Sequence, residues 1–217
     1  VGRIIGKDDL EVRKIRKDAG IIPAVKQIDT LAAEWPAKTN YLYLTYGGDT
    51  NDFEVQSDQE KIIVLGAGPY RIGSSVEFDW GTVNMVWGLQ ENGIKEVSVI
   101  NCNPETVSTD YDICDRLYFE ELTLERILDI ADFEKPAGIV TAVGGQTANN
   151  LTPKLAKNGI KIIGTAYENI DKAENRSKFS QVLDELHIKQ PPWQAFSSLS
   201  DAKKFANNVG YPVLVRP

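Results

Sequence analysis

Two polar loops follow apolar runs in the first half of the sequence, and they carry residue types that could hold or steer a small anion. The first, residues 66–73, is rich in glycine, and the second, residues 101–112, holds eight short polar or acidic side chains. Because the carboxyl ends of adjacent parallel strands share one ligand-binding edge of an α/β sheet, the two loops are expected side by side. That edge would gather the charged groups of Arg71, Glu77, Asp79 and Glu105.

The glycine loop matches a dinucleotide-binding fingerprint only in part. Gly66 and Gly68 fit its start, but Gly73 comes too late, and Pro69 lacks an N–H that could face an anion. The second strand ends in Asn101 instead of the acidic residue that binds ribose hydroxyls. The loop is therefore a structural tight turn or a site for another ligand, and a nicotinamide or flavin cofactor is the less favoured interpretation.

The second loop has two interpretations that the sequence leaves open. Its Asn, Asp, Ser and Thr residues could satisfy their own backbone in tight turns, or they could bind a ligand. Cys102 lies in this loop without a histidine neighbour that would activate a nucleophile. The only other cysteine is Cys114, so the sequence predicts neither a disulfide framework nor a zinc site and favours a reducing compartment.

The composition is that of ordinary globular material, with 217 residues, 42% hydrophobic and 25% charged. The net charge of -7 argues against a nucleic-acid or anionic-membrane surface, because such surfaces need a basic excess. No apolar run approaches the length of a membrane-spanning helix. The first residue is Val1 and not methionine, which suggests a fragment.

The hydrophobic periodicity predicts an α/β fold with a parallel sheet. A charged helix at 8–18, whose basic face is expected to be solvated, and a tyrosine-rich run precede a polar linker at 47–60. Strands and helices then alternate. Strands are expected at 62–65, 97–100, 117–119, 138–143 and 161–163, and helices at 75–90 and 123–133. Beyond Gly164 we expect helices at 170–186 and 200–209 and strands at 193–196 and 212–216.

At these motifs the chain closely resembles the large (synthetase) component of carbamoyl phosphate synthetase. The resemblance covers nearly the whole chain, and several long motifs follow one another in the right order and spacing. The matching stretches are residues 68–80, 101–112, 115–120, 144–147, 170–176 and 211–217.

The resemblance implies a domain order and an activity. Residues 1–58 would be the end of a helical oligomerisation domain plus a linker, 59–168 a Rossmann-like pre-ATP-grasp domain, and 169–217 the truncated start of an ATP-grasp module. The chain would begin the second half of the synthetase, which phosphorylates carbamate with ATP. The parent would make carbamoyl phosphate from bicarbonate, ammonia or glutamine nitrogen, and ATP. The fragment alone is expected to be inactive, since the flap and the Mg²⁺ or Mn²⁺ ligands would lie beyond residue 217.

Site residues are implied by the resemblance, position by position. Arg176 and Arg216 match two arginines that contact ATP, and a guanidinium fork suits phosphate oxygens. Four further residues match the lining of a tunnel that carries carbamate between two active sites: Arg71, Ser75, Glu77 and Glu105. Ser75 departs from the glycine of bacterial relatives, and Asn175 replaces an aspartate that is common beside the nucleotide arginine.

The implied partners are the remaining domains of the large component and a glutaminase subunit or domain, within an oligomeric parent. No nucleic acid or membrane is expected. A cytoplasmic location is expected, with a mitochondrial one as the alternative, and the pathway could be that of arginine, urea or pyrimidines. A competing interpretation is a non-catalytic binding or assembly module with an α/β nucleotide-binding-like fold. A dinucleotide-dependent oxidoreductase ranks third.

Overall fold

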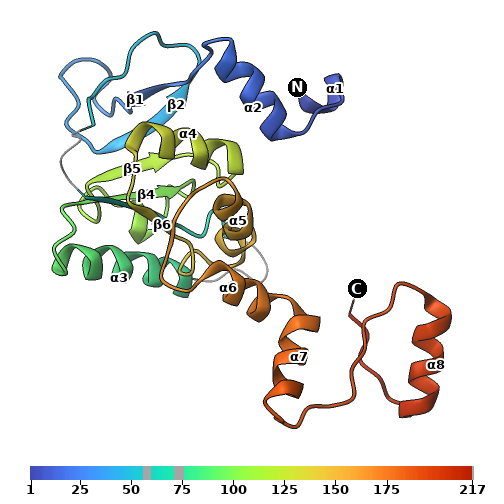
Figure 1. Cartoon of the computed structure of the whole chain (residues 1–217). Helices are drawn as coiled ribbons and strands as arrows, with labels where there is room; N and C mark the ends of the chain where they lie inside the picture. The colour runs from blue at the N-terminus through green and yellow to red at the C-terminus, as the bar shows by residue number, and fades with distance from the viewer. Residues whose placement is uncertain (56–59, 71–75, 217) are drawn as a thin grey trace. The chain divides into compact units, whose positions relative to one another are not determined.

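The computed structural model describes residues 1–55, 60–70 and 76–216, and it divides into two compact units (Figure 1). The first unit is Val1–Tyr167 and the second begins at Glu168. Each unit has its own internal packing. The loops that the sequence predicts to carry chemistry lie in the first unit, and the two arginines assigned to ATP lie in the second.

Among the described residues, seven strands of the first unit form one sheet in the order β1-β2-β5-β4-β3-β6-β7. All neighbours are parallel except β1 and β2, which are antiparallel. The sheet confirms the predicted α/β class, with a mostly parallel sheet. The strands are β1 (Ala24–Gln27), β2 (Tyr41–Thr45), β3 (Lys61–Leu65), β4 (Glu96–Asn101), β5 (Arg116–Phe119), β6 (Gly138–Val140) and β7 (Ile162–Ile163).

Helices cover both faces of this sheet, as Figure 1 shows for α3 on one side and α4 and α5 on the other. Alternate residues of β3 point to opposite faces. Ile63 and Leu65 pack with the cluster that includes α4 and α5, and Ile62 and Val64 pack with α3. Full burial of such a side chain contributes about 1.5–3 kcal/mol, so both faces stabilise the sheet edge that carries the loops. The helical elements of this unit are α1 (Gly2–Ile5), α2 (Asp9–Asp18), α3 (Glu77–Glu91), the 3₁₀ turn η1 (Val107–Thr109), α4 (Leu124–Glu134) and α5 (Gly145–Lys157).

The second unit differs from the sequence-based expectation in two places. The helix expected at 170–186 is broken at Asn175, because the side chain of Asn175 accepts a hydrogen bond from the Lys178 amide (3.1 Å) and so caps a new helix. The described residues include no strand at 193–196 or 212–216, since no neighbouring strand pairs with them there. The helices are α6 (Tyr167–Glu174), which crosses the unit boundary, α7 (Arg176–Glu185) and α8 (Leu199–Val209).

Residues 24–45 contribute two strands that the sequence did not predict. β2 pairs in parallel with β5, with Tyr41 opposite Leu117, and the ring of Tyr41 meets Phe119 edge-on at 5.1 Å. β1 then covers the outer side of β2. The tyrosine-rich run is therefore part of the same sheet as the predicted α/β core.

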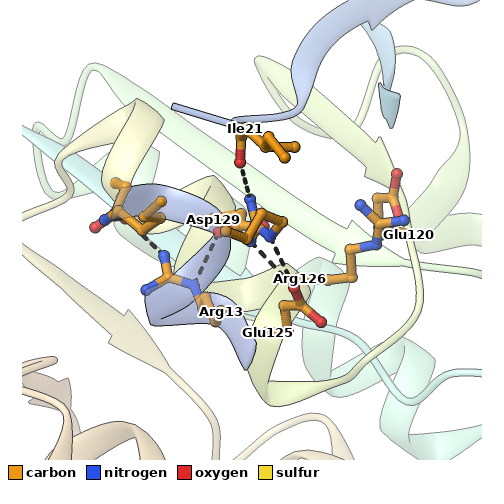
Figure 2. Close-up of polar contacts among 9 residues, drawn as sticks. Arg13, Ile21, Glu120, Glu125, Arg126 and Asp129 are labelled. Carbon is orange, nitrogen blue, oxygen red and sulfur yellow. Dashed lines mark hydrogen bonds and ion pairs between the residues drawn. The ribbon is translucent and has the colours of Figure 1, made fainter. Parts of the chain in front are cut away.

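Helix α2 is held to α4 by ion pairs and buries none of its own residues. Both oxygens of Asp129 are engaged, Oδ1 by Arg13 Nε (2.8 Å) and Oδ2 by Arg16 Nη2 (2.7 Å). Figure 2 shows Arg13 beside Asp129. The two arginine side chains are only 13% and 11% exposed. The prediction of a solvated basic face is therefore wrong for Arg13 and Arg16, which bind the acidic face of α4.

Further contacts surround this pair of arginines. Arg13 also binds Asp132 (2.6 Å), and Arg16 binds Glu125 (3.1 Å) and donates to the carbonyl of Ile21 (2.9 Å). We use the name α2–α4 clasp for Arg13, Arg16, Lys17, Glu125, Asp129 and Asp132.

Candidate functional site

The two predicted loops meet at the carboxyl edge of β3 and β4, which are parallel neighbours. The contact between them is made by the side chain of Asn101, the last residue of β4, which is 1% exposed. Its Oδ1 accepts from the amide of Gly68 (3.0 Å), and its Nδ2 donates to Ser108 Oγ (3.2 Å). The buried side chain of Asn101 therefore connects Gly68 of the glycine loop to Ser108 of the second loop.

Glycine is needed at residue 66 because of this buried amide. A Cβ at Gly66 would lie 2.6 Å from Asn101 Nδ2, and Gly68 adopts a positive φ of 73°. The amide of Gly68 already has Asn101 as its acceptor, so it does not face an open anion site. Asn101 therefore holds the glycine loop to the end of β4 at Gly68.

The second loop satisfies much of its own backbone. Thr109 Oγ1 donates to the carbonyls of Asn103 (2.9 Å) and Thr106 (2.8 Å), and the Glu105 amide donates to Asn103 Oδ1 (3.0 Å). The tight-turn interpretation of these short polar side chains is thus correct for Asn103 and Thr109. The Glu105 side chain remains exposed and accessible to a ligand.

Asp79, on the first turn of α3, supplies the other anchor of this loop. Its carboxylate is 6% exposed and accepts from the amides of Val107 (3.1 Å) and Ser108 (3.1 Å). The sequence placed Asp79 at this edge but gave it no role, since nothing in the local sequence indicates which distant amides a carboxylate will bind.

An open cleft of about 430 Å³ lies between the start of α3 and the second loop. Its walls are largely apolar, and the hydroxyl of Tyr70 contacts Thr106 Oγ1 at 2.5 Å across one end. Glu105 is the one exposed carboxylate among the described lining residues. The lining consists of Tyr70, Val76, Asp79, Trp80, Val83, Trp87, Glu105, Thr106 and Val107.

The predicted tunnel residues are placed only in part. Glu77 is the first residue of α3 and is exposed, and Glu105 lines the cleft beside that helix. Glu77 is not among the described lining residues of the cleft. Arg71 and Ser75 lie outside the described residues.

The two arginines predicted to contact ATP belong to the second unit. Arg176 is the first residue of α7, and Arg216 follows the cis-proline bond at Tyr211–Pro212 by four residues. Both are exposed, and neither has a hydrogen-bond or ion-pair partner within the part of the chain that the structure describes. An exposed guanidinium of this kind can accept a phosphate fork.

The cysteines offer no activated thiol. Burial raises the pKa of Cys102, and it raises the pKa of Cys114 to about 12. Both shifts disfavour the thiolate that nucleophilic chemistry requires. Across residues 1–55, 60–70 and 76–216, no three His, Cys, Asp or Glu side chains gather into a metal-binding group. No helix in these same ranges has both the length and the apolar character needed to cross a bilayer.

A second polar cluster lies at the opposite, amino-terminal edge of the sheet. Arg116, the first residue of β5, binds the fully buried Glu134 (2.7 Å) and Glu96 (2.6 Å), and Tyr118 donates to Glu134 (2.5 Å). Burial and the neighbouring Glu134 carboxylate raise the pKa of Tyr118. The charged groups of this cluster bind one another, so we interpret the cluster as structural.

The mostly parallel sheet, with two polar loops at its carboxyl edge, defines an α/β ligand-binding class of domain, and comparison with protein families identifies which one. Residues 58–172 match the profile described as the carbamoyl phosphate synthase preATP-grasp domain, and the chain belongs to this family.

Several curated relatives match along the entire chain. It is 55% identical over 217 residues to the mitochondrial carbamoyl-phosphate synthase [ammonia] of Rattus norvegicus and 54% identical over 218 residues to the carbamoyl phosphate synthase large chain of Hyperthermus butylicus. It is 52% identical over 217 residues to the multifunctional protein URA2 of Saccharomyces cerevisiae. All of this chain is covered, but only 14%, 20% and 10% of these three proteins, respectively.

A solved structure supports the fold alone. The biotin carboxylase domain of the Hydrogenobacter thermophilus 2-oxoglutarate carboxylase superposes with a TM-score of 0.52 at 18% identity. The match covers 71% of this chain and 34% of that one.

Proposed function

We propose that this chain is part of the large component of a carbamoyl phosphate synthetase, an ATP-dependent ligase. It would begin the second half, which phosphorylates carbamate. The support is the identity of 52–55% to the named synthases and to URA2 along the whole chain, together with the family match at residues 58–172. The second half is proposed because the N-terminal residues resemble the end of the helical domain that joins the two halves.

The proposed domain order follows those motifs. Residues 1–58 would end the helical oligomerisation domain and its linker, 59–168 would form the pre-ATP-grasp domain, and 169–217 would start the ATP-grasp module. The chain covers 10–20% of the three compared relatives. By the family resemblance, its partners would be the remaining domains of the large component and a glutaminase subunit or domain. The fragment alone would lack catalysis. The parent would be cytoplasmic, with a mitochondrial location as the alternative, and it would serve the arginine, urea or pyrimidine pathway.

Arg71, Ser75, Glu77 and Glu105 are proposed to line the carbamate passage. The observation that carries this proposal is the position of Glu105, exposed on the wall of the cleft beside the start of α3. Carbamate is an anion that decomposes in water, so a passage must confine it without binding it tightly. Carboxylates beside an arginine would offset the arginine's attraction for the anion.

ATP would be contacted by Arg176 and Arg216, whose exposed guanidinium groups are free within the described residues. Mg²⁺ or Mn²⁺ would accompany the nucleotide, with ligands beyond residue 217. The chain would therefore supply only part of the nucleotide site, and the rest of the ATP-grasp module would complete it.

Two assays of the parent enzyme test the proposed function. The extended chain should form ATP from ADP and carbamoyl phosphate, whereas a non-catalytic binding module would form none even with an intact flap. In the full-length enzyme, Glu105→Gln or Ser75→Phe should raise the ATP consumed per carbamoyl phosphate formed. Asp110→Asn, a change of an exposed carboxylate in the same loop that does not line the cleft, is the matched control. Full coupling in both variants would exclude Glu105 and Ser75 from the passage.

A further inference from the structure

The carboxylate of Asp79 is buried without a cation to pair it, within the described residues. It belongs to the buried face of α3 and is 6% exposed. A buried carboxylate is costly unless hydrogen bonds satisfy it. Val107 N donates to Oδ2 at 3.1 Å, and Ser108 N donates to Oδ1 at 3.1 Å and to Oδ2 at 3.4 Å. Backbone amides of the second loop therefore stabilise the buried negative charge of Asp79 by hydrogen bonding.

These hydrogen bonds join the two short segments that carry the proposed tunnel glutamates. Glu77 lies two residues before Asp79 on α3, and Glu105 lies two residues before Val107 in the loop. Only Thr106 separates Glu105 from the anchored amides. The position of Glu105 relative to the start of α3 thus depends on a carboxylate that does not itself need to touch a ligand.

We propose that Asp79 is a positioning residue that fixes the spacing between Glu77 and Glu105. The inference rests on the proposed carbamate passage. A passage that balances attraction and repulsion depends on the separation of its charges, and displacement by about 1 Å at such a site is enough to impair its chemistry. Two charge-assisted hydrogen bonds to consecutive amides hold the loop against rotation as well as translation.

The first experiment measures coupling in the full-length synthetase. Asp79→Asn removes the charge and turns an NH₂ group toward one of the two amides, so the ratio of ATP hydrolysed to carbamoyl phosphate formed should rise about threefold or more. ATP formation from ADP and carbamoyl phosphate should stay within about twofold, because the proposed ATP contacts, Arg176 and Arg216, belong to the second unit. Asp79→Glu keeps the charge and both acceptors and should restore part of the coupling.

Asp115→Asn is the matched control. Asp115 also accepts from a backbone amide, that of Val97 (2.8 Å), but it does so at the start of β4, at the other edge of the sheet. Asp115 is exposed and Asp79 is buried, so the two losses of stability need not be equal. The control tests whether loss of any carboxylate–amide hydrogen bond changes the coupling ratio. The proposal requires the coupling ratio to change only for Asp79→Asn.

The second experiment measures the hydrogen exchange of the loop amides in the 217-residue chain. By hydrogen exchange, the Val107 and Ser108 amides should exchange at least about tenfold faster in Asp79→Asn, while Asp115→Asn should affect Val97. Unchanged Val107 and Ser108 exchange would overturn the positioning role, whatever the enzyme assay gives. Faster exchange with unchanged coupling would also overturn it, provided that Glu105→Gln uncouples the enzyme. If Glu105→Gln leaves coupling intact as well, the proposed passage itself fails.

A second variant covers the case in which Asp79→Asn does not fold. Val107→Pro removes the Val107 amide donor, replaces one side chain of the cleft wall and leaves Asp79 bonded to Ser108. Val107 is the first residue of η1, where proline is tolerated, and Thr106 has the extended backbone (φ -146°, ψ 153°) that precedes proline. This variant should raise the coupling ratio in the same direction, and a fully coupled Val107→Pro enzyme would contradict the proposal.

Discussion

Asp79 and Asp129 are two buried aspartates of the same unit whose charges are satisfied in different ways. They are 6% and 7% exposed, respectively. Asp129 in the α2–α4 clasp binds two arginines that come from more than 100 residues earlier in the chain. Asp79 binds two consecutive backbone amides less than 30 residues later.

The two aspartates therefore have different structural roles. Asp129 holds two helices together, whereas Asp79 fixes the local geometry of a loop. Arginine side chains are long and can follow small movements of α2, and their attraction to Asp129 persists over several ångströms. Backbone amides move only with the chain that carries them, so the loop at Asp79 has little freedom. The clasp is suited to holding a helix that buries none of its own residues, and the Asp79 anchor to fixing a site.

Asp129→Ala should have the largest effect on stability. It leaves Arg13 and Arg16 without their shared buried partner, and we expect a loss of about 3 kcal/mol in the free energy of unfolding. The estimate is at the low end for buried pairs because Asp132 and Glu125 still contact these arginines. Urea denaturation measures the loss, and a cost below about 1 kcal/mol would show that the clasp does not hold α2.

Gly66→Ala should destabilise the chain by about 1–3 kcal/mol, because the added methyl would press on Asn101 at 2.6 Å. The control is Gly88→Ala on α3, where nothing lies within 4 Å of the new methyl. That change should stabilise the helix by about 0.5–1 kcal/mol. If both substitutions stabilise the chain in thermal denaturation, the site edge is less rigid than its contacts indicate.

Salt should distinguish the two aspartate environments. Raising NaCl from about 0.1 to 1 M shortens the screening length from about 10 to 3 Å. The unfolding cost of Arg13→Met should fall, because Asp132, the second partner of Arg13, is half exposed and its attraction is screened by salt. The cost of Asp79→Asn should stay constant, since its donors are uncharged amides in direct contact. Equal salt dependence in paired urea titrations would remove the distinction drawn between them.

Acid should weaken the clasp slightly, through Asp132. Partial burial raises the pKa of Asp132, but hydrogen bonds from Lys17 and Arg13 outweigh it and leave the pKa below its ordinary value. A lowered pKa stabilises the fold at neutral pH, and this stability is lost as the pH falls below about 4 and through the folded-state pKa. Because Asp132 is half exposed, Asp132→Asn should cost only about 0.5 kcal/mol at pH 7, and less as the pH is lowered through the folded-state pKa. An undiminished cost at low pH would contradict this origin.

The sequence was sufficient to predict the central strands and helices because their apolar residues are periodic and continuous. Ile62 and Val64 alternate with Ile63 and Leu65 in a run that only a sheet covered on both faces can bury. The strands β1 and β2 were missed although β2 is as long as β3, because they precede the region in which strands and helices alternate. The sheet contacts of β2 depend on Leu117, more than 70 residues away.

The site was predictable in its location but not in its internal contacts. The motif order placed the two loops at one edge, and the structure confirms that they meet through Asn101. Neither the amide partners of Asp79 nor the partners of Arg13 and Arg16 could be predicted, because pairing across many residues leaves no periodic signal. The helix break at Asn175 could not be predicted either, because an Asn within a charged helical run looks like a surface residue in the sequence. The structure shows that its side chain caps the next helix.

The antiparallel hairpin of β1 and β2 has a consequence for how the domain can be cut. The family profile begins at residue 58, yet β2 covers the edge of β5 from residues 41–45. A truncated protein starting at residue 58 would expose an unpaired strand edge at β5, which invites association between copies. The minimal soluble unit should therefore include residues from Ala24 onward, and size-exclusion chromatography of the two lengths would compare them directly.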